Sequence, residues 1–467
     1  MKFSTIIKHS AELSRIIVNS SSPADSLASE YLRSKKYIGS NDRKLISEIV
    51  FSNLRVLTLA EQAISEFLFV KKIDSLSKDD ILILNILSSI IINDALNSAF
   101  LSNINANLAK LGLEFASLAD IITNVTTELA IDAIVSDDLF AYLSDFTNTY
   151  IENINADSKL KPSELCLSET VINSLSKRYD NAFIKSLSLE LMRSAPLCIR
   201  VNTLIASVDD ILEKLSDNEI IAQKSTLSPA GIIIPERVNL SNNDFFKDGS
   251  IEVQDIGSQL ISYALDPEED SRILDACAGA GGKTLHLAAL TNDNAEITAT
   301  DTEYKRLKEI SIRANKAGIS SITPIVIKEN QLKTQVNRKF QHILIDAPCS
   351  GLGTVRRMPM QKYRLNDKLL KRICKNQLEI LEYYSQFLAN SGTLVYATCS
   401  LLPDENDEII GRFLSEHPEF APVPLSESFN RFGISIPNLK DDAFSLALTP
   451  LNGETDGFFM AKIQKVV

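Results

Sequence analysis

The sequence predicts an α/β protein in three parts, and three observations support that prediction. Leu, Ile and Val recur at helical spacing through residues 1–150, where no strand pattern is convincing, so this part is predicted to be all-α. Strand and helix patterns alternate through residues 251–467, as in a doubly wound, mostly parallel sheet with helices on both faces. Residues 151–250 mix short helices and strands, which predicts a linker helix and a small α/β subdomain.

Helices are predicted in the first part wherever apolar residues repeat at intervals of three and four. The clearest segments are residues 4–18, 42–66 and 78–100. Pro23 follows three serines, which predicts a turn between helices. The polar residues 153–162 predict a linker to the next part.

The second and third parts contain the predicted strands. A helical stretch over 169–192 and a helix over 208–216 accompany strands at 197–202, 220–225 and 231–235. The large sheet is predicted from strands at 272–276, 296–300, 323–328, 341–346, 393–398 and 457–463, with a long helix over about 367–388. Ligands of such a sheet bind at the carboxyl ends of its strands, so the residues that follow the strands are candidates for a site.

Composition excludes several classes of protein. Of the 467 residues, 45% are hydrophobic and 23% are charged, as in ordinary globular proteins. The longest apolar run, residues 81–93, is shorter than the ~20 residues that a membrane-spanning helix needs. Lys8, His9 and Glu12 interrupt any apolar core of a signal peptide. We therefore expect a cytoplasmic protein without membrane contact.

The cysteines and histidines argue against a metal site. The six cysteines are far apart with no Cys-x-x-Cys pair, and the four histidines are isolated from one another. This pattern predicts reduced thiols, no disulfide framework and no bound metal.

Charge is unevenly distributed along the chain. The net charge of −12 argues against a protein that coats nucleic acid indiscriminately. Residues 1–55 nevertheless hold nine Lys and Arg against five Asp and Glu, an excess of +4. Residues 356–375 contain eight Lys and Arg and a single acidic residue, Asp367. This basic segment is either a solvated charged face or a patch that binds phosphates beside an active site.

A glycine-rich loop follows the first strand of the large sheet. It has the sequence Asp275-Ala276-Cys277-Ala278-Gly279-Ala280-Gly281-Gly282-Lys283-Thr284 and leads into a helix. Glycines let a ligand approach the backbone, and a helix N-terminus offers free N–H donors. A P-loop is excluded because its first glycine would fall on Cys277, and a dinucleotide fingerprint is excluded because its third glycine would fall on Thr284. The loop therefore predicts a nucleoside-bearing cofactor of another kind.

Asp301 ends the second strand of the large sheet, 22 positions after Gly279. An acidic side chain at this place can accept hydrogen bonds from both hydroxyls of a ribose. The same side chain can instead cap the helix that begins near Glu303. The two roles are compatible.

Two cysteines follow consecutive strands of the predicted sheet. Cys349 lies in Asp346-Ala347-Pro348-Cys349-Ser350-Gly351, and Cys399 lies in Thr398-Cys399-Ser400. A single cysteine is usually a small buried apolar residue. Neighbouring strands lie about 4.8 Å apart, however, so both thiols and Asp346 are predicted to face the same site as the cofactor. A thiolate, an acid and an electrophilic cofactor together predict covalent catalysis.

These motifs resemble the RsmB/Sun group of RNA cytosine-C5 methyltransferases, within the wider Sun family that uses S-adenosylmethionine. The resemblance covers nearly the full length and includes Ile199-Arg200-Val201-Asn202, Val253-Gln254-Asp255, the glycine loop, Asp301 with Arg306, Asp346–Gly351, Tyr396-Ala397-Thr398-Cys399-Ser400 and Asp456-Gly457-Phe458-Phe459. Residues 1–150 resemble a NusB-like helical RNA-binding domain around Ser40-Asn41-Asp42-Arg43. The fold that this resemblance implies is a NusB-like domain, an RRM-like subdomain and a Rossmann-like class I methyltransferase domain.

The resemblance also implies roles for individual residues. Cys399 would be the nucleophile, and Cys349 would assist release of the methylated product. The cofactor S-adenosyl-L-methionine would contact Cys277, Ala278, Gly279, Ala280, Gly281, Gly282, Lys283, Asp301, Arg306, Asn330 and Asp346. Asn330 stands where the family usually has Asp, and its amide oxygen can still accept a hydrogen bond from the adenine amino group. The candidates for contacts with RNA phosphates are Arg356, Arg357, Lys362 and Arg364.

The expected mechanism follows from the chemistry of cytosine. C5 is a poor nucleophile, so the Cys399 thiolate first adds to C6 while Asp346 stabilises or protonates N3. C5 then attacks the sulfonium methyl group, without a metal, and loss of the C5 proton with elimination frees the enzyme. The target base must be single-stranded or flipped out of its stack.

The NusB-like resemblance favours 16S rRNA as the substrate, with tRNA and 23S rRNA as alternatives for the same chemistry. An alternative of a different class is a non-catalytic RNA-binding or antitermination factor, against which the two thiols and the complete cofactor loop argue. We expect an enzyme that acts as a monomer.

Overall fold

The computed structural model describes residues 1–466 except residues 75, 98–99, 132, 156–160, 237, 328–331, 333–335 and 337. The chain forms two compact units. The helical unit comprises Met1–Ser194 and Val355–Asn366, and the sheet unit comprises Ala195–Thr354 and Asp367–Val467. Among the described residues, no helix combines the length and the apolar character that crossing a membrane requires.

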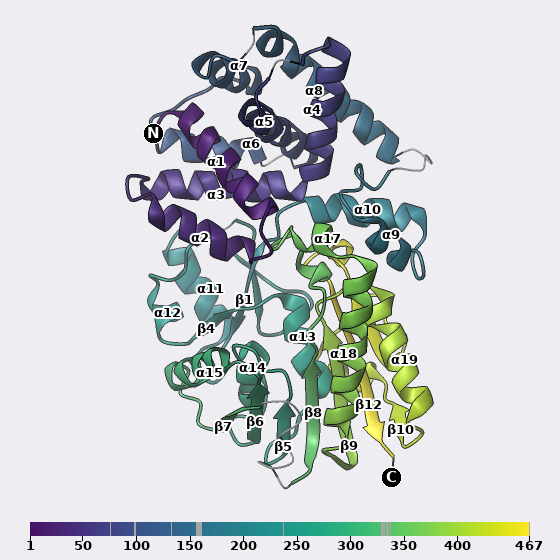
Figure 1. Ribbon diagram of the computed structural model, residues 1–467. Helices are drawn as coiled ribbons and strands as arrows, with labels where there is room; N and C mark the ends of the chain where they lie inside the picture. The colour runs from purple at the N-terminus through teal and green to yellow at the C-terminus, as the bar shows by residue number, and fades with distance from the viewer. Residues whose placement is uncertain are drawn as a thin grey trace. The chain divides into compact units, whose positions relative to one another are not determined.

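The helices of the helical unit pack around a core rich in Leu, Ile and Phe side chains. Its helices are α1 (Phe3–Val18), α2 (Ala24–Ser34), α3 (Ser40–Arg55), α4 (Leu57–Lys71), α5 (Lys78–Leu96), α6 (Phe100–Ala109), α7 (Leu118–Glu128), α8 (Ala133–Asn155), α9 (Glu169–Leu175), α10 (Asn181–Met192) and α17 (Gln361–Arg364) (Figure 1). The prediction of an all-α first part is confirmed.

Two of the predicted helices are each divided in the structure. Segment 42–66 contributes to α3 and α4, which are separated at Val56 with φ −116° and ψ 20°. Segment 78–100 contributes α5, which ends where Asn97 becomes extended, and the start of α6. The sequence does not reveal either break, because no Pro or Gly stands there to interrupt the helical pattern. The predicted linker 153–162 includes the end of α8, and its residues 156–160 lie outside the described residues.

The sheet unit begins with a small antiparallel sheet in the order β2-β3-β1-β4. Its elements are β1 (Leu197–Val201), α11 (Val208–Asp217), β2 (Gln223–Lys224), β3 (Gly231–Ile234), α12 (Asp244–Lys247) and β4 (Ile251–Val253). The first three strands fall within predicted segments, whereas β4 was not predicted. Three residues with a central Glu252 are too short to show a strand pattern.

The larger sheet has the order β10-β12-β9-β8-β5-β6-β7, and β11 pairs with β12. Neighbours from β5 to β9 are parallel, whereas β12 is antiparallel to β9. The strands are β5 (Arg272–Asp275), β6 (Glu296–Asp301), β7 (Ile322–Val326), β8 (Phe340–Asp346), β9 (Leu388–Thr398), β10 (Phe420–Pro422), β11 (Ser445–Leu448) and β12 (Phe458–Lys465). The six strands predicted for this sheet are present, and β10 and β11 are additional. The chain order reverses at β5, the kind of place where open α/β sheets bind ligands.

Helices cover both faces of the larger sheet (Figure 1). They are α13 (Ile256–Leu265), α14 (Gly282–Leu290), α15 (Tyr304–Lys316), α18 (Asp367–Ser385), α19 (Asp407–Glu416) and α20 (Leu425–Arg431), with the short 3-10 helices η1 (Leu352–Thr354), η2 (Pro403–Glu405) and η3 (Pro450–Asn452). Successive residues of a strand point to opposite faces. Ile273 of β5 accordingly packs with α13 and α14, whereas Leu274 packs with α18 and α19. The prediction of a doubly wound, mostly parallel sheet is confirmed.

Candidate active site

The glycine loop joins β5 to α14 with backbone angles that glycine adopts readily. Gly279 has a φ of 55° and Gly281 a φ of 88°. A Cβ at Gly281 would lie 2.7 Å from Cγ1 of Ile310, so a side chain there would push α15 away. A Cβ at Gly279 would meet no atom within 4 Å, so this part of the loop is open to an approaching ligand.

A buried carboxylate supports the loop from within the protein. Asp275 is 1% exposed, and its Oδ2 accepts a hydrogen bond of 2.7 Å from Oγ1 of Thr284 on α14. Burial raises the pKa of Asp275 to about 7, against the effect of the Thr284 hydrogen bond and with help from the Asp346 carboxylate. The contact ties the end of β5 to the first turn of the helix that follows the loop.

Asp301 contacts both the glycine loop and the start of α15. Its Oδ2 accepts the Gly279 N–H at 3.0 Å, and its Oδ1 accepts the Glu303 N–H at 2.8 Å. Glu303 is the residue just before α15, so Asp301 binds an N–H ahead of the helix, and the capping role considered from the sequence is not formed. Each carboxylate oxygen has a further lone pair, so Asp301 retains acceptors for a ribose.

Lys283 of α14 and Asp346 at the end of β8 form an ion pair. Nζ lies 2.6 Å from Oδ2, and the side chains are 12% and 30% exposed. Burial alone would favour the neutral amine, but the Asp346 carboxylate outweighs it and raises the pKa of Lys283, and the charge of Cys399 adds to the rise. A positive charge is therefore fixed at this edge of the sheet, within electrostatic reach of Cys399.

The two cysteines predicted on neighbouring strands lie in contact. β8 and β9 are adjacent and parallel, with Asp346 opposite Ala397. Sγ of Cys349 lies 3.2 Å from Sγ of Cys399. The hydrogen bond to Cys399, together with burial, raises the pKa of Cys349 well above its usual value. Cys349 therefore stays a thiol at neutral pH, next to the Cys399 sulfur.

Of the remaining predicted cofactor residues, Cys277 and Ala278 belong to the same loop and Arg306 lies on α15. Burial raises the pKa of the Cys277 thiol well above its usual value, so this cysteine has the properties of a structural thiol. The Ala278 N–H donates to the carbonyl oxygen of Thr300, which joins the loop to β6. Arg306 of α15 pairs with Glu303 at 3.1 Å. Asn330 lies outside the described residues.

Two protein-family models match the chain in this region. Residues 262–464 match the family 16S rRNA methyltransferase RsmB/F, and residues 168–241 match the RsmF/B-like ferredoxin-like domain. The first match contains the glycine loop, Asp301 and both cysteines. Residues 262–464 are therefore similar to the RsmB/F methyltransferases.

The chain is also similar to curated relatives and to solved structures. The chain is 34% identical over 269 residues to the probable ribosomal RNA small subunit methyltransferase B of Bacillus subtilis (strain 168), a match to 57% of this chain and 59% of that protein. The match thus spans about three fifths of the relative. The structure of a methyltransferase homolog from Pyrococcus horikoshii is 28% identical with a TM-score of 0.51, covering 64% of this chain and 100% of that one. The structure of PH0851 is 22% identical with a TM-score of 0.70 over 99% of both chains, which shows a shared fold.

The basic segment that follows the Cys349 loop is divided between the two units. Its first part, Val355–Asn366, belongs to the helical unit. Lys362 is fully buried, its Nζ donates to the carbonyl oxygen of Arg55 at 2.6 Å, and burial lowers its pKa to about 8. Arg356 is 5% exposed and donates to the carbonyl oxygen of Ser194 at 3.1 Å. The prediction of phosphate contacts is therefore wrong for Lys362 and Arg356, because protein encloses both side chains.

The other two arginines of this part are partly exposed. Arg364 donates to the carbonyl oxygen of Ser20 at 2.6 Å, just past the end of α1, where helix carbonyls lack partners within the helix. Arg357 is half-buried. Neither position is excluded from contact with RNA by burial.

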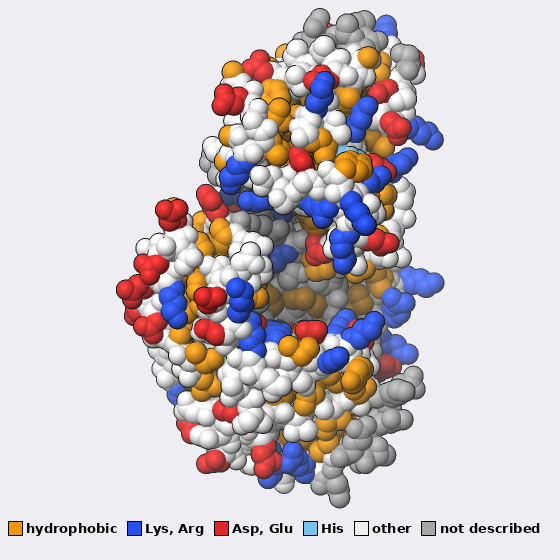
Figure 2. Space-filling model, turned by 90° about the vertical axis from the view of Figure 1, so that its left-hand side faces the viewer, with side chains coloured by type: hydrophobic (Ala, Val, Ile, Leu, Met, Phe, Trp, Pro, Cys, Tyr) orange, Lys and Arg blue, Asp and Glu red, His pale blue; other side chains and the backbone are white. Residues whose placement is uncertain are grey.

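The second part of the basic segment is exposed on the sheet unit. Lys368, Lys371, Arg372 and Lys375 all lie in solvent along α18. Figure 2 shows that basic side chains are interspersed with acidic ones on the face drawn there, so positive charge is local and does not cover a whole face. The exposed row on α18 is therefore the better candidate for phosphate contacts.

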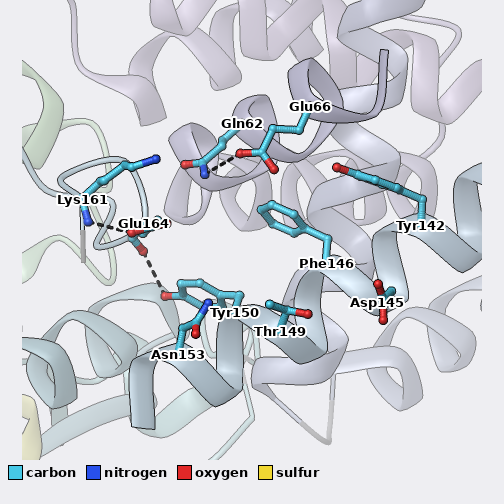
Figure 3. A pocket seen from close by; sticks show the side chains of 10 residues that line it. All are labelled: Gln62, Glu66, Tyr142, Asp145, Phe146, Thr149, Tyr150, Asn153, Lys161 and Glu164. Carbon is cyan, nitrogen blue, oxygen red and sulfur yellow. Dashed lines mark hydrogen bonds between the residues drawn. The ribbon is translucent and has the colours of Figure 1, made fainter. Parts of the chain in front are cut away.

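A pocket of about 260 Å³ lies within the helical unit, between α4, α8 and residues 161–164 (Figure 3). Its lining residues are Gln62, Glu66, Tyr142, Asp145, Phe146, Thr149, Tyr150, Asn153, Lys161 and Glu164. Three of these are acidic and one is basic, so the pocket disfavours an RNA phosphate.

Sequence reasoning missed one buried acidic residue beside the thiols. Glu405 of η2 is fully buried and contacts both Ser350 and Ser400, the residues that follow the two cysteines. The signal available in the sequence was the repeated Cys-Ser pair at the ends of two neighbouring strands. Nothing in that repeat, however, identifies the acidic residue that the two serines share.

Proposed function

We propose that this protein is an S-adenosyl-L-methionine-dependent methyltransferase that methylates C5 of a cytosine in small-subunit (16S) rRNA. The observation that carries the proposal is the 3.2 Å contact between the Cys349 and Cys399 sulfurs, at the carboxyl ends of adjacent strands. A pair of thiols suits a reaction in which one sulfur bonds to the substrate and the other takes part in its release. The RsmB/F family match supports the choice of rRNA.

The glycine loop and Asp301 fit the cofactor. The open position above Gly279 admits a ligand to the backbone, and Asp301 lies next to it with free acceptor capacity. When bound, S-adenosyl-L-methionine supplies an electrophilic methyl group. Asp275 and Ile310 hold the loop in the shape that leaves this position open.

Cys399 is the nucleophile in the proposed mechanism. Its thiolate adds to C6 of cytosine, and the resulting enamine character makes C5 nucleophilic. The Lys283 ammonium places a positive charge near Cys399, and it donates a hydrogen bond to Asp346. Asp346 then passes a proton from the Lys283 ammonium to N3 of the ring, which neutralises the negative charge that develops there as the sulfur adds.

Cys349 acts after methyl transfer. As the C6–S bond breaks, Cys349 gives its proton to the sulfur of Cys399 and takes up the C5 proton in its place, so both cysteines end this step as thiols. Cys349 is held as a thiol 3.2 Å from the departing sulfur, so it can exchange a proton with Cys399 as that bond breaks.

Methylation of transcribed RNA tests this function. The full-length protein is incubated with radiolabelled S-adenosyl-L-methionine and with 16S rRNA, 23S rRNA or tRNA, and bisulfite sequencing locates modified cytosines. We expect label in 16S rRNA at one or a few cytosines, and none with Cys399→Ala. Label confined to 23S rRNA or tRNA would contradict the substrate, and label at an atom other than cytosine C5 would contradict the reaction.

A further inference from the structure

Glu405 binds the residues that follow both cysteines. Its Oε1 accepts the Ser350 backbone N–H at 2.8 Å and Nε2 of Gln377 at 3.1 Å. Its Oε2 accepts Oγ of Ser350 at 2.5 Å and also Oγ of Ser400. A carboxylate that is 0% exposed therefore has four donors on its two oxygens, which compensates for its burial.

The backbone that carries Glu405 is itself fixed to β9. The hydroxyl of Tyr396 donates to the carbonyl oxygen of Glu405 at 2.8 Å. Nδ2 of Asn406 donates to the carbonyl oxygen of Ser400 at 2.9 Å, and Oδ1 of Asn406 accepts Oγ1 of Thr398 at 2.6 Å. Glu405 is therefore held in place independently of the serine hydroxyls that it binds.

We propose that Glu405 is a positioning residue that holds the Cys349 and Cys399 loops in one arrangement by binding the serine that follows each cysteine. This inference rests on the proposed function, because it assumes that the two thiols act together in methyl transfer to cytosine. The position of the thiols, however, is a property of the protein without RNA, so it can be measured separately.

The negative charge of Glu405 affects the pKa of Cys349, an effect that an uncharged residue in the same place would not have. Among the described residues, the groups that shift the pKa of Cys349 are Cys399, Glu405 and the Gly351 backbone, which lowers it, and Tyr396 interacts with Cys349 as well. The hydrogen bond with Cys399 is the largest cause of the raised pKa of Cys349, burial comes next, and the Glu405 carboxylate adds to both. Removing that negative charge must lower the pKa of Cys349.

Glu405→Gln isolates the effect of charge. Glutamine has the same shape, its oxygen can accept the Ser350 N–H, and its amide can donate to the serine hydroxyls, so the loops keep their partners. In a Cys399→Ala background, alkylation of Cys349 by iodoacetamide is followed by peptide mass spectrometry against pH. We expect Glu405→Gln to shift this profile to lower pH, and Glu408→Gln, an exposed neighbour on α19, to leave it unchanged. An unshifted profile in Glu405→Gln would show that the Glu405 carboxylate does not act on Cys349, which would contradict the proposal.

The double variant Ser350→Ala with Ser400→Ala tests the positioning itself. We expect slower bridging of Cys349 to Cys399 by dibromobimane, measured on the linked peptides without RNA. We also expect a kcat lower by about 100-fold with unchanged cofactor affinity, because misplacement by about 1 Å costs that much. Bridging at the wild-type rate would overturn the proposal. If the wild-type protein methylates no RNA, the proposed function fails, while the alkylation and bridging measurements still decide the role of Glu405.

Discussion

Lys362 donates from Nζ to the carbonyl oxygen of Arg55, 2.6 Å away, across 307 positions of sequence. Arg55 in turn donates from Nε to the carbonyl oxygen of Arg356 at 2.9 Å. Met360, between these residues, belongs to the hydrophobic core of the helical unit. The chain therefore enters that unit soon after Cys349, and the helical unit is complete only when this segment is present.

Replacing Lys362 with Met should change how stability depends on pH. Burial lowers the pKa of Lys362 to about 8, whereas a lysine in the unfolded chain has a pKa of about 10.4. At a pH between these two pKa values, Lys362 carries a proton in the unfolded chain but has lost it in the folded chain. The wild type therefore gains stability relative to Lys362→Met as pH rises. We expect the difference in the free energy of unfolding between the wild type and Lys362→Met to grow by about 3 kcal/mol between these two pH values. Urea denaturation at several pH values measures it. Lys368→Met, at an exposed position, is the control, and a pH-independent difference for Lys362→Met would contradict the burial of its amine.

The cysteine variants should separate attack from release. Cys399→Ser should abolish methylation, because an alcohol is a far weaker nucleophile than a thiolate near neutral pH. Cys349→Ser should instead accumulate a covalent RNA adduct, because Cys399 still attacks while release fails. Denaturing gels report the adduct as a slowly migrating band. An adduct with Cys399→Ser and normal turnover with Cys349→Ser would reverse the two roles.

Asp301→Ala should weaken binding of S-adenosyl-L-methionine by roughly ten- to a hundredfold. The variant removes a charge-assisted hydrogen bond of roughly 1.5–3 kcal/mol to the ribose and releases the Gly279 N–H that Asp301 now accepts. Isothermal calorimetry measures the affinity, with Glu309→Gln, exposed on α15, as the matched control. Unchanged affinity would leave Asp301 only its role at the start of α15.

Neutralising the exposed row on α18 should weaken RNA binding in a salt-dependent manner. Lys368, Lys371, Arg372 and Lys375 are changed together to Gln, and RNA affinity is measured across salt concentrations. The slope of log affinity against log salt should flatten by about 0.7 for each phosphate that the variant no longer binds. Lys362→Met should leave the slope unchanged, because its amine does not reach solvent. A slope equal to that of the wild type in the quadruple variant would identify the row as an ordinary solvated face.

Local patterns in the sequence were sufficient for the large sheet and for the thiol pair. Apolar runs mark the consecutive strands β8 and β9, and strands that are consecutive along the chain tend to be neighbours in the sheet. Cys349 and Cys399, which follow these two strands, could therefore be placed side by side. The glycine loop was also evident, because its residues are contiguous and the positive φ of Gly281 requires a residue without a Cβ.

Contacts between distant positions were decided only by the tertiary structure. The basic residues near Lys362 were predicted to be exposed because charged side chains are rarely buried without a partner, and the partner here is a carbonyl oxygen at Arg55. Glu405 meets Ser350 from 55 positions away. Helix and strand periodicity reports which face of an element is apolar, but it carries no information on which distant polar atom satisfies a buried charge. That is why the sequence indicated the two thiols and only the folded chain revealed the carboxylate that joins their loops.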